Sequence, residues 1–298
     1  MLKQNVLDAK NSLKRYPFPQ DVVVETTAYC NLRCVMCPQK DLTRPRGYMD
    51  TKVFRMIVEE VARESPQSRL WVAIMGEPLL HPKIAIMVEY ATYLGLRVCL
   101  NTNAMLLDAK IGQDLVSAGV AEVLVGLDAA TKETYERIRV GGDFDRVVYN
   151  TLRFKEMAGD KLRVLCQFIE MEQNCTETDA FREFWLSKGM EVKIRPRLGW
   201  GLGVKAENLV VPANERFPCP WLIRTVSIHW DGTIAQCDGD YDEKYTVGKI
   251  QDMTIAEAWE GELAKRRERH WQGDFTYPSC VNCKDWQAGR SYYYAPQC

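Results

Sequence analysis

The chain has 298 residues, and 39 Lys and Arg stand against 40 Asp and Glu, which gives a formal net charge of −1 at pH 7. This balance provides no overall electrostatic attraction to nucleic acid or to an anionic membrane surface. No uninterrupted apolar run reaches the roughly 18 residues of a membrane-spanning helix, and the first 20 residues lack the apolar core of a signal peptide. We therefore expect a cytoplasmic protein.

The chain begins with a polar helical extension over 1–20, which Pro17 and Pro19 end. From residue 21 to about 200, short β-branched runs alternate with helical patterns. The expected strands are 21–28, 70–75, 96–101, 122–127, 162–169 and 191–194. The expected helices are 51–63, 82–94, 108–117 with Asp108 as N-cap, a helical region after 127 that is interrupted at Gly141-Gly142, and 177–188.

This alternation predicts an α/β fold with a parallel sheet, because each strand is followed by a helix or ends the run. Six strand–helix units are too few for the closed eight-stranded barrel. The pattern therefore favours either a partial (β/α)6 TIM barrel or an open doubly wound sheet. In both folds, ligands bind beyond the carboxyl ends of the strands.

The composition and the pattern of the sequence change near residue 200. Residues 195–220 are rich in Pro and Gly, and a β-hairpin is expected over 225–236 with its turn at Asp231-Gly232. A helix is expected over 254–270. We predict an N-terminal extension over 1–20, a partial barrel over 21–200 and a small C-terminal domain of hairpin and helix over 201–298.

Three of the 11 cysteines lie close together, as Cys30, Cys34 and Cys37, directly after the first expected strand. In a reducing compartment, cysteines are more often metal ligands, redox groups or small core residues than disulfides. A structural zinc ion needs four nitrogen or sulfur ligands, and a catalytic one needs three and a water molecule. A four-iron cluster normally takes four thiolates, so three would leave one iron open to a small molecule.

This C-x3-C-x2-C motif resembles that of the radical S-adenosylmethionine (SAM) enzymes. In that family, the open iron of a [4Fe–4S] cluster chelates the amino and carboxylate groups of SAM. An electron from the cluster cleaves SAM to a 5′-deoxyadenosyl radical, which abstracts hydrogen from the substrate. The resemblance implies that the three cysteines hold such a cluster and, by analogy, that flavodoxin or ferredoxin donates the electron.

Further motifs extend the resemblance to the binding of SAM. Glu77, in Met75-Gly76-Glu77-Pro78, matches the family's GGEP motif except at Met75, and its carboxylate would bind the methionine ammonium. Asn101 and Asn103 end the third expected strand, where the family contacts the ribose.

The fourth and fifth strands supply the remaining expected contacts. Asp128, in Gly126-Leu127-Asp128, is similar to the aspartate of the family's SLDG motif. Gly126 replaces a serine that would bind the SAM carboxylate, and Arg139 is the expected replacement. The other expected neighbours of ribose and adenine are Gln167, Ile169 and, by soft packing, Met36.

Each of these residues has an ordinary structural interpretation when it is taken alone: a surface carboxylate, a turn residue, a helix cap or a solvated charge. Together they fall at the ends of successive expected strands. This joint placement favours the SAM-binding interpretation.

A second metal site is expected in the C-terminal region, at Cys219, Cys237, Cys280 and Cys283. The spacing resembles the "twitch" module, a shortened SPASM domain that holds one auxiliary [4Fe–4S] cluster. The expected hairpin would bring Cys219 and Cys237 together, and zinc is the main alternative. Cys298 is the only later cysteine, which argues against a second auxiliary cluster.

The other cysteines match neither site. Cys99 and Cys166 lie on expected strands and are interpreted as small core residues. A role as a hydrogen-atom-donating thiol stays open for Cys99, Cys175 and Cys298.

The substrate is expected to bind near Arg195 and Arg197, at the end of the sixth strand, where either guanidinium can grip a hydroxyl, carboxylate or phosphate or form an inter-domain salt bridge. The favoured reaction is oxidation of a secondary alcohol of a carbohydrate or aminocyclitol in antibiotic biosynthesis. The auxiliary cluster would accept the second electron. The alternatives are a redox-neutral sugar epimerase or decarboxylase, a peptide or sulfatase maturase, and a non-catalytic zinc-binding protein.

Overall fold

The computed structural model describes residues 2–206, 209–288 and 292–294. In this part of the chain, one sheet has the strand order β10-β6-β5-β4-β3-β2-β1-β7-β8-β9. Its six consecutive parallel strands are β1 Asp21–Val24, β2 Arg69–Val72, β3 Arg97–Thr102, β4 Glu122–Gly126, β5 Arg163–Glu170 and β6 Glu191–Pro196. The expected partial (β/α)6 barrel is thereby confirmed.

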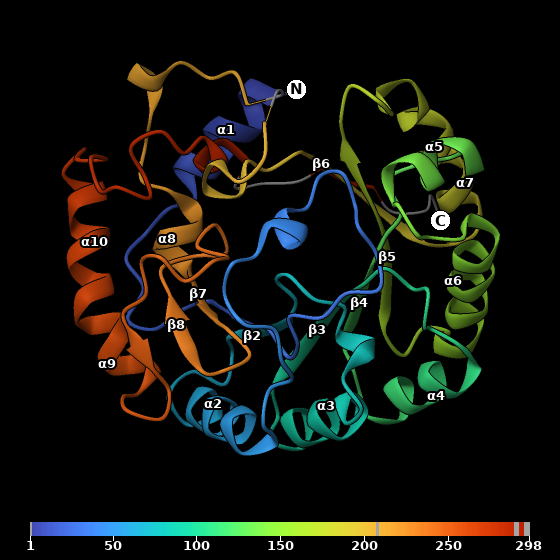
Figure 1. Cartoon of the computed structure of the whole chain (residues 1–298), viewed down its shortest axis with the longest axis horizontal. Coiled ribbons are helices and arrows are strands. Elements are labelled where there is room, and N and C mark those ends of the chain that lie inside the picture. The colour runs from blue at the N-terminus through green and yellow to red at the C-terminus, as the bar shows by residue number, and fades with distance from the viewer. Residues whose placement is uncertain (1, 207–208, 289–291, 295–298) are drawn as a thin grey trace.

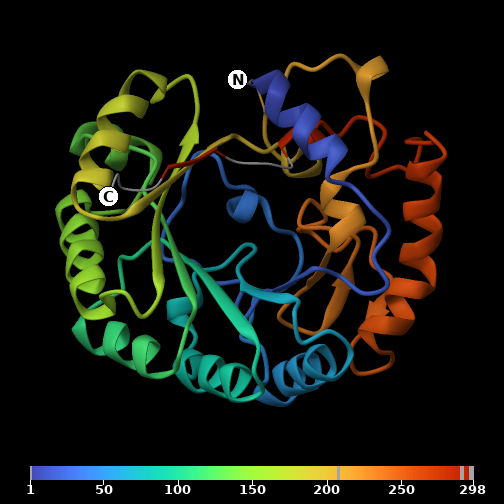
Figure 2. The same ribbon diagram turned by 180° about the vertical axis from the view of Figure 1, so that it is seen from behind.

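The connecting helices form an arc outside the strands, and the segment after β1 crosses the space inside the arc (Figures 1 and 2). In α2, the buried Val53, Ile57 and Val61 repeat at helical spacing and face the sheet. Asp108 caps α4 as expected, because its side chain accepts a hydrogen bond from the Ile111 amide at 2.9 Å. The helices are α2 Thr51–Glu64, α3 Ile84–Tyr93, α4 Ala109–Ser117, α5 Lys132–Ile138, α6 Phe144–Ala158 and α7 Thr178–Ser187.

The C-terminal hairpin is part of the same sheet as the barrel. Strand β7 (Thr225–Ile228) pairs in parallel with β1, and β8 (Thr233–Ala235) pairs with β7 and with β9 (Gly248–Lys249). The sequence predicts the hairpin itself. It does not predict that the hairpin pairs with β1. The domain boundary near residue 200 stays a prediction.

The helix expected over 254–270 is wrong in one respect, because the structure has two helices there, α9 (Ile255–Glu260) and α10 (Glu262–Trp271). The break lies at Gly261, whose ψ is −112°. A Cβ atom at this position would lie 2.6 Å from the Glu257 carbonyl oxygen, so the bend requires glycine.

A buried polar network joins the segment after the three cysteines to the C-terminal region. Arg44 forms an ion pair with Glu25 at 2.6 Å and donates a hydrogen bond to the Tyr241 carbonyl, also at 2.6 Å. The Thr43 hydroxyl donates to Asp242 at 2.6 Å. Because Glu25 and Arg44 are both buried, these bonds compensate for the lost hydration of the charges.

The remaining elements cover the ends of the barrel. The expected N-terminal helix is α1 (Leu2–Asn11), and β10 (Tyr292–Tyr294) pairs antiparallel with β6. No helix of the described residues is long and apolar enough to cross a membrane. The short elements are α8 Pro220–Arg224 and the 3-10 helices η1 Pro38–Asp41, η2 Pro78–Leu80, η3 Cys175–Glu177, η4 Trp200–Leu202, η5 Ala213–Glu215 and η6 Asp285–Ala288.

Candidate functional site

A cavity of about 480 Å³ lies inside the barrel. Every strand from β1 to β7 contributes to its wall. Of the residues that the sequence singles out for the barrel site, Asp128 alone does not line it. Those that do are Cys30, Cys34, Met36, Cys37, Glu77, Asn101, Asn103, Arg139, Gln167, Ile169, Arg195 and Arg197. The structure thus gathers residues from six loops and strand ends around one space.

The three cysteines lie on a loop that backbone hydrogen bonds attach to the end of α5. The Val35 amide donates to the Ile138 carbonyl at 3.0 Å. Burial, reinforced by the neighbouring thiols, raises the pKa of Cys30 to about 11 and that of Cys37 to about 12. Since a metal binds the thiolate, a metal or cluster bound by these cysteines would displace their protons and compensate for the burial of charge.

Strained backbone holds Glu77 in place. Ile74 has a φ of 96°, which is an outlier for a β-branched residue. A Cβ atom at Gly76 would overlap the Thr27 carbonyl oxygen, so the loops after β1 and β2 can meet only with glycine there. This contact explains the Gly-Glu pair of the motif.

The Glu77 carboxylate is buried and accepts three hydrogen bonds from the protein. The Thr102 hydroxyl and the Asn103 amide each donate at 2.7 Å, and the Leu79 amide donates at 3.2 Å. Burial nevertheless raises the pKa of Glu77. A carboxylate has about four acceptor positions, so one remains for a ligand in the cavity.

Asn101 on β3 and Asn103 in the turn after it differ in their hydrogen bonding. Asn103 is oriented within the protein, since its Nδ2 donates to Asn31 Oδ1 at 2.8 Å. The Oδ1 atom of Asn101 is buried and has no hydrogen-bond partner in the described structure. A buried acceptor without a partner is costly, so this oxygen is suited to bind a donor group of a ligand.

Arg139 is already engaged with Asp128. Its Nε donates to Asp128 Oδ2 at 2.9 Å, Nη2 contacts the same oxygen, and Nη1 lies 3.7 Å from Cys34 Sγ. Burial alone would lower the pKa of Arg139, but Asp128 and Cys34 raise it above its usual value. The guanidinium lies over Gly126 in the space that a side chain there would fill. The missing side chain at Gly126 thus leaves room for the Arg139 guanidinium.

Both carboxylate oxygens of Asp128 bind other groups of the protein in this structure. It is fully buried, its Oδ1 accepts the Ile169 amide hydrogen at 2.7 Å, and its Oδ2 pairs with Arg139. A direct contact between Asp128 and a cofactor stays a prediction.

An apolar patch lies beside the cysteine loop. Met36 and Ile169 are buried and pack in one cluster with Ile138 and Met171. Since Met36 and Ile169 also line the cavity, they form a flat apolar wall of the kind that an adenine ring can pack against.

The two arginines at the end of β6 are tied to neighbouring elements. Arg195 Nε donates to Gln167 Oε1 at 3.0 Å, and Arg197 Nη2 donates to the Val35 carbonyl in the cysteine loop at 3.1 Å. Burial lowers the pKa of Arg195. Both side chains therefore project into the cavity near the cysteines.

The structure places the four C-terminal cysteines near one another. Cys219 precedes α8, Cys237 follows β8, and mutual electrostatic interactions among Cys219, Cys237, Cys280 and Cys283 accompany their burial. Burial raises the pKa of Cys219 to about 12 and holds the pKa of Cys237 well above its usual value. Gln236 Nε2 donates to Cys280 Sγ at 3.2 Å, which is a contact suited to a thiolate.

No three His, Cys, Asp or Glu side chains of the described residues converge closely enough to hold a single metal ion.

The remaining cysteines lie outside both groups. Cys99 and Cys166 are fully buried, as expected, and Cys175 is exposed. Cys99 does not line the cavity. Cys298 lies outside the described residues.

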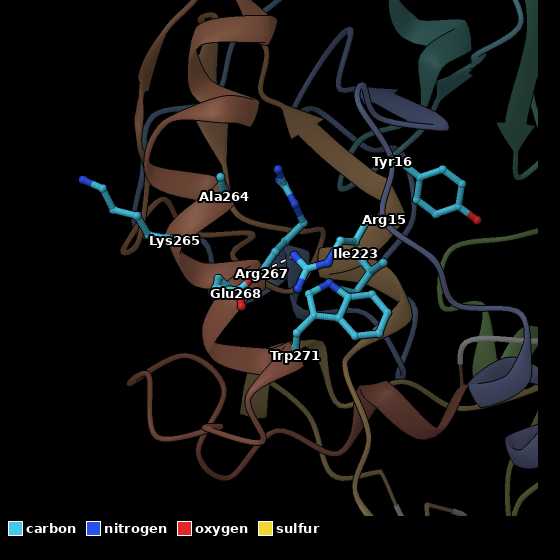
Figure 3. A pocket seen from close by; sticks show the side chains of 8 residues that line it. All are labelled: Arg15, Tyr16, Ile223, Ala264, Lys265, Arg267, Glu268 and Trp271. Atoms are coloured by element: carbon cyan, nitrogen blue, oxygen red, sulfur yellow. Dashed lines mark hydrogen bonds and ion pairs between the residues drawn. The ribbon is translucent and has the colours of Figure 1, made fainter.

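A second cavity, of about 350 Å³, lies between the segment after α1 and helix α10 (Figure 3). Arg15 forms an ion pair with Glu268 at 2.6 Å across it and lies over the Trp271 ring. No cysteine lines this cavity.

The deeper part of the main cavity is lined by residues that belong to none of the sequence motifs. Trp71 on β2 and Lys193 on β6 line it, together with an ion pair between Asp21 and Arg69 at 2.6 Å. Strand alternation places Lys193 on the same face as Arg195 and could have identified it. Trp71 carried no such signal, because it lies within an apolar run.

Comparison with known proteins decides the family. The model of the radical SAM superfamily matches residues 24–169, and that of the SPASM iron–sulfur cluster-binding domain matches residues 219–284. The chain belongs to the radical SAM superfamily. The two domains imply a SAM-binding [4Fe–4S] cluster, an auxiliary [4Fe–4S] cluster and SAM. The clustered thiols and the unpartnered acceptor of Asn101 fit these groups.

Solved structures share this fold. The structure of BtrN in complex with AdoMet and 2-DOIA has a TM-score of 0.67 at 19% identity and covers 94% of this chain and 98% of that one. Streptococcus suis SuiB bound to precursor peptide SuiA has a TM-score of 0.71 at 12% identity, with coverage of 96% and 74%. At these identities, the likeness concerns the fold alone.

Curated relatives match shorter stretches. The AdoMet-dependent heme synthase of Methanosarcina barkeri is 36% identical over 44% of this chain and 37% of its own length. The mycofactocin maturase MftC of Mycobacterium tuberculosis is 29% identical over 57% of this chain and 42% of its own. The chain therefore spans less than half of the length of each of these two proteins. Their names describe two different activities.

Proposed function

We propose that this radical SAM enzyme holds its SAM-binding cluster with Cys30, Cys34 and Cys37. The four C-terminal cysteines would hold the auxiliary cluster. When bound, the first cluster and SAM supply a 5′-deoxyadenosyl radical for hydrogen abstraction, and the auxiliary cluster supplies a one-electron acceptor. The observation that carries this proposal is that three thiols and the Glu77 carboxylate line one cavity.

The residues around the cavity are suited to hold SAM. Glu77 has one acceptor position left for an ammonium group. Asn101 offers a buried oxygen to a ribose hydroxyl, and Met36 and Ile169 offer an apolar wall to adenine. Nη1 of Arg139 can donate to the SAM carboxylate without leaving Asp128, whereas a two-pronged contact would require that pair to break.

The reaction that we propose is oxidation of a secondary alcohol to a ketone on a carbohydrate or aminocyclitol. The alcohol carbon loses a hydrogen atom, the hydroxyl loses a proton, and one further electron leaves the substrate. The polar lining of the cavity and its aromatic Trp71 support a polyol, because an indole face packs against the C–H face of a sugar. The presence of a second cluster domain supports a reaction that must dispose of an electron.

The redox-neutral alternative, a sugar epimerase or decarboxylase, places a different demand on the cavity. An epimerase must return a hydrogen atom to the substrate, which usually requires a donor thiol at the site. Cys99 is buried behind the wall and does not line the cavity. The peptide-maturase alternative has the fold likeness to SuiB in its favour, but that likeness carries no substrate information.

The test is anaerobic reconstitution followed by iron and sulfide analysis and by addition of SAM and dithionite. We expect about eight irons per chain, as two four-iron clusters require, and formation of 5′-deoxyadenosine. Cys34→Ala should abolish SAM cleavage, while Cys175→Ala, an exposed thiol, is the matched control and should not. Little iron and no cleavage in the reconstituted wild type would refute the proposal.

A further inference from the structure

Helix α10 places a buried cation beside the C-terminal cysteines. Leu263, Arg266 and His270 repeat at helical spacing and form the buried face of this helix. An arginine on such a face is unusual, because a buried guanidinium loses its hydration. The same face contacts the cysteine group, since the Cys219 amide donates a hydrogen bond to His270 Nδ1 at 3.2 Å. Arg266 thus lies one helical turn before a direct contact with this group.

Arg266 has partners on several sides. Its Nη1 donates to the Tyr245 carbonyl at 2.7 Å and to Gln236 Oε1 at 3.0 Å. Its Nε pairs with Glu262 at 3.2 Å, and its Cζ lies 4.5 Å from the centre of the Tyr277 ring. The Glu262 side chain is 45% exposed, so water screens that pair, whereas Gln236 is buried. The positive charge therefore acts most strongly on the buried side, toward Gln236.

Gln236 connects Arg266 to the sulfur of Cys280. An arginine can only donate hydrogen bonds, so the Gln236 oxygen must face Arg266 and its Nε2 must face away. Nε2 donates to Cys280 Sγ at 3.2 Å and to Ser279 Oγ at 3.0 Å. Because Ser279 Oγ accepts there, its own hydrogen can point to Cys280 Sγ, 3.6 Å away. Cys280 thus receives an amide hydrogen that the arginine polarises.

Two other cysteines of the group receive hydrogen bonds from backbone amides. The Leu222 amide contacts the Cys219 thiol, and the Asp285 amide contacts the Cys283 thiol. Such donors follow from the path of the chain, and a substitution does not remove them. The donor from Gln236 depends on a side chain, so its effect can be measured by substitution.

Other charges lie near this hydrogen-bonded chain. Asp240 interacts with Arg266, and Arg269 interacts with Cys280. Arg269 pairs with Asp274 at 2.7 Å, and Asp240 accepts hydrogen bonds from two backbone amides. These groups are the same in every variant compared below, so their contribution cancels from the differences.

We propose that Gln236 and Arg266 are positioning residues that raise the reduction potential of the auxiliary cluster. The inference rests on the proposed function, which assigns this cluster to the four C-terminal cysteines. Reduction adds one negative charge, and an N–H donor at a ligand sulfur and a nearby cation stabilise the reduced form more than the oxidised form. A higher potential favours the transfer in which the cluster gains the one electron that the substrate radical loses, while the hydroxyl proton is released to water.

The test is an anaerobic redox titration of the full-length chain, followed by visible absorbance and electron paramagnetic resonance. The parent protein carries Cys30→Ala, Cys34→Ala and Cys37→Ala, so that the auxiliary cluster alone, with about four irons per chain, contributes to the spectrum. Gln236→Met keeps the length of the side chain and removes the N–H donor. We expect it to lower the midpoint potential by at least about 59 mV, which is a tenfold change in a one-electron equilibrium constant.

Variants of Arg266 test whether it acts through Gln236. Arg266→Met should lower the potential by a smaller amount, and Arg266→Lys, which keeps the charge, should recover part of it. In a Gln236→Met background, Arg266→Met should shift the potential less than it does alone. Lys265→Met is the matched control, because it removes a cation that is 78% exposed and pairs with Glu262 on the same helix. The potential of this control should not change.

The inference is overturned if Gln236→Met holds about four irons and keeps the potential of the parent. It is also overturned if Lys265→Met lowers the potential as much as Arg266→Met, or if Arg266→Met causes the same shift in both backgrounds. If Gln236→Met takes up less iron, the two Arg266 variants decide. A fall that lysine partly restores supports the inference, and an unchanged potential overturns it.

Failure of the proposed function has a different signature. In that case the reconstituted wild type holds little iron and forms no 5′-deoxyadenosine. An enzyme that holds both clusters and cleaves SAM, but whose auxiliary potential does not respond to Gln236 or Arg266, would retain the proposed function and lose this inference alone.

Discussion

The contact between Gly126 and Arg139 can be tested by adding a single methyl group. In Gly126→Ala, the new Cβ atom would overlap Nη2 of Arg139 and lie 3.1 Å from its Cζ atom. Ordinary contacts between such atoms are about 3.5–4.0 Å. A free arginine would swing aside at little cost. Arg139, however, is only 11% exposed and is held by Asp128, which is fully buried.

The guanidinium must therefore give up at least one of its two hydrogen bonds to Asp128. A hydrogen bond to a charged group contributes about 1.5–3 kcal/mol, so we expect Gly126→Ala to lower the free energy of unfolding by about that amount. The assay is urea unfolding of the cluster-free protein under reducing, anaerobic conditions, followed by circular dichroism. Working without clusters avoids metal release during the transition.

A double-mutant cycle isolates the contact. In an Arg139→Ala background the space over Gly126 is empty, so Gly126→Ala should then cost less than about 0.5 kcal/mol. An equal loss of stability in both backgrounds would refute the reasoning, because the methyl group would then be clashing with something other than the guanidinium.

Two further outcomes are expected. Glu77→Gln should weaken SAM binding to the reconstituted protein about tenfold, measured by titration, because the charge that faces the ammonium is lost. Cys237→Ser should lower the iron content from about eight to about four per chain, by colorimetric assay, while SAM cleavage persists.

Each has its own control. For Glu77, iron content must stay at the wild-type level, since a loss of the first cluster would show a structural effect. For Cys237, the control is Cys175→Ser, and an unchanged iron content would mean that Cys237 binds no cluster.

Local patterns in the sequence were sufficient to predict the barrel. The β-branched run before Cys30 marks strand β1, the pattern over 191–194 marks the first part of β6, and Asp108 marks the start of α4. Because these patterns are local, they also predict one helix over 254–270 where the structure has two. The amphipathic pattern continues through Gly261, and only the backbone conformation there shows the break.

The types of residue in the site could be predicted from the sequence. Which of these residues bind one another was harder to predict. Strand ends placed Glu77 and Asn101 correctly in one cavity. The bond between Arg139 and Asp128 was not foreseen, because it depends on how α5 packs against the end of β4. The charge of the cavity depends on Asp21 at the start of β1 meeting Arg224 of α8, a contact between residues far apart in the chain. No local pattern encodes such a contact.

The pairing of β1 with β7 has a mechanical consequence. Four residues of each strand are in register, from Asp21 with Thr225 to Val24 with Ile228. The loop that carries Cys30 leaves one of these strands, and Cys219 lies just before the other. Hydrogen-bonded pairing of β1 with β7 therefore ties the backbone that leads to Cys30 to the backbone that follows Cys219. If the two cysteine groups hold clusters as proposed, an electron that passed between them would cross a gap that this pairing constrains.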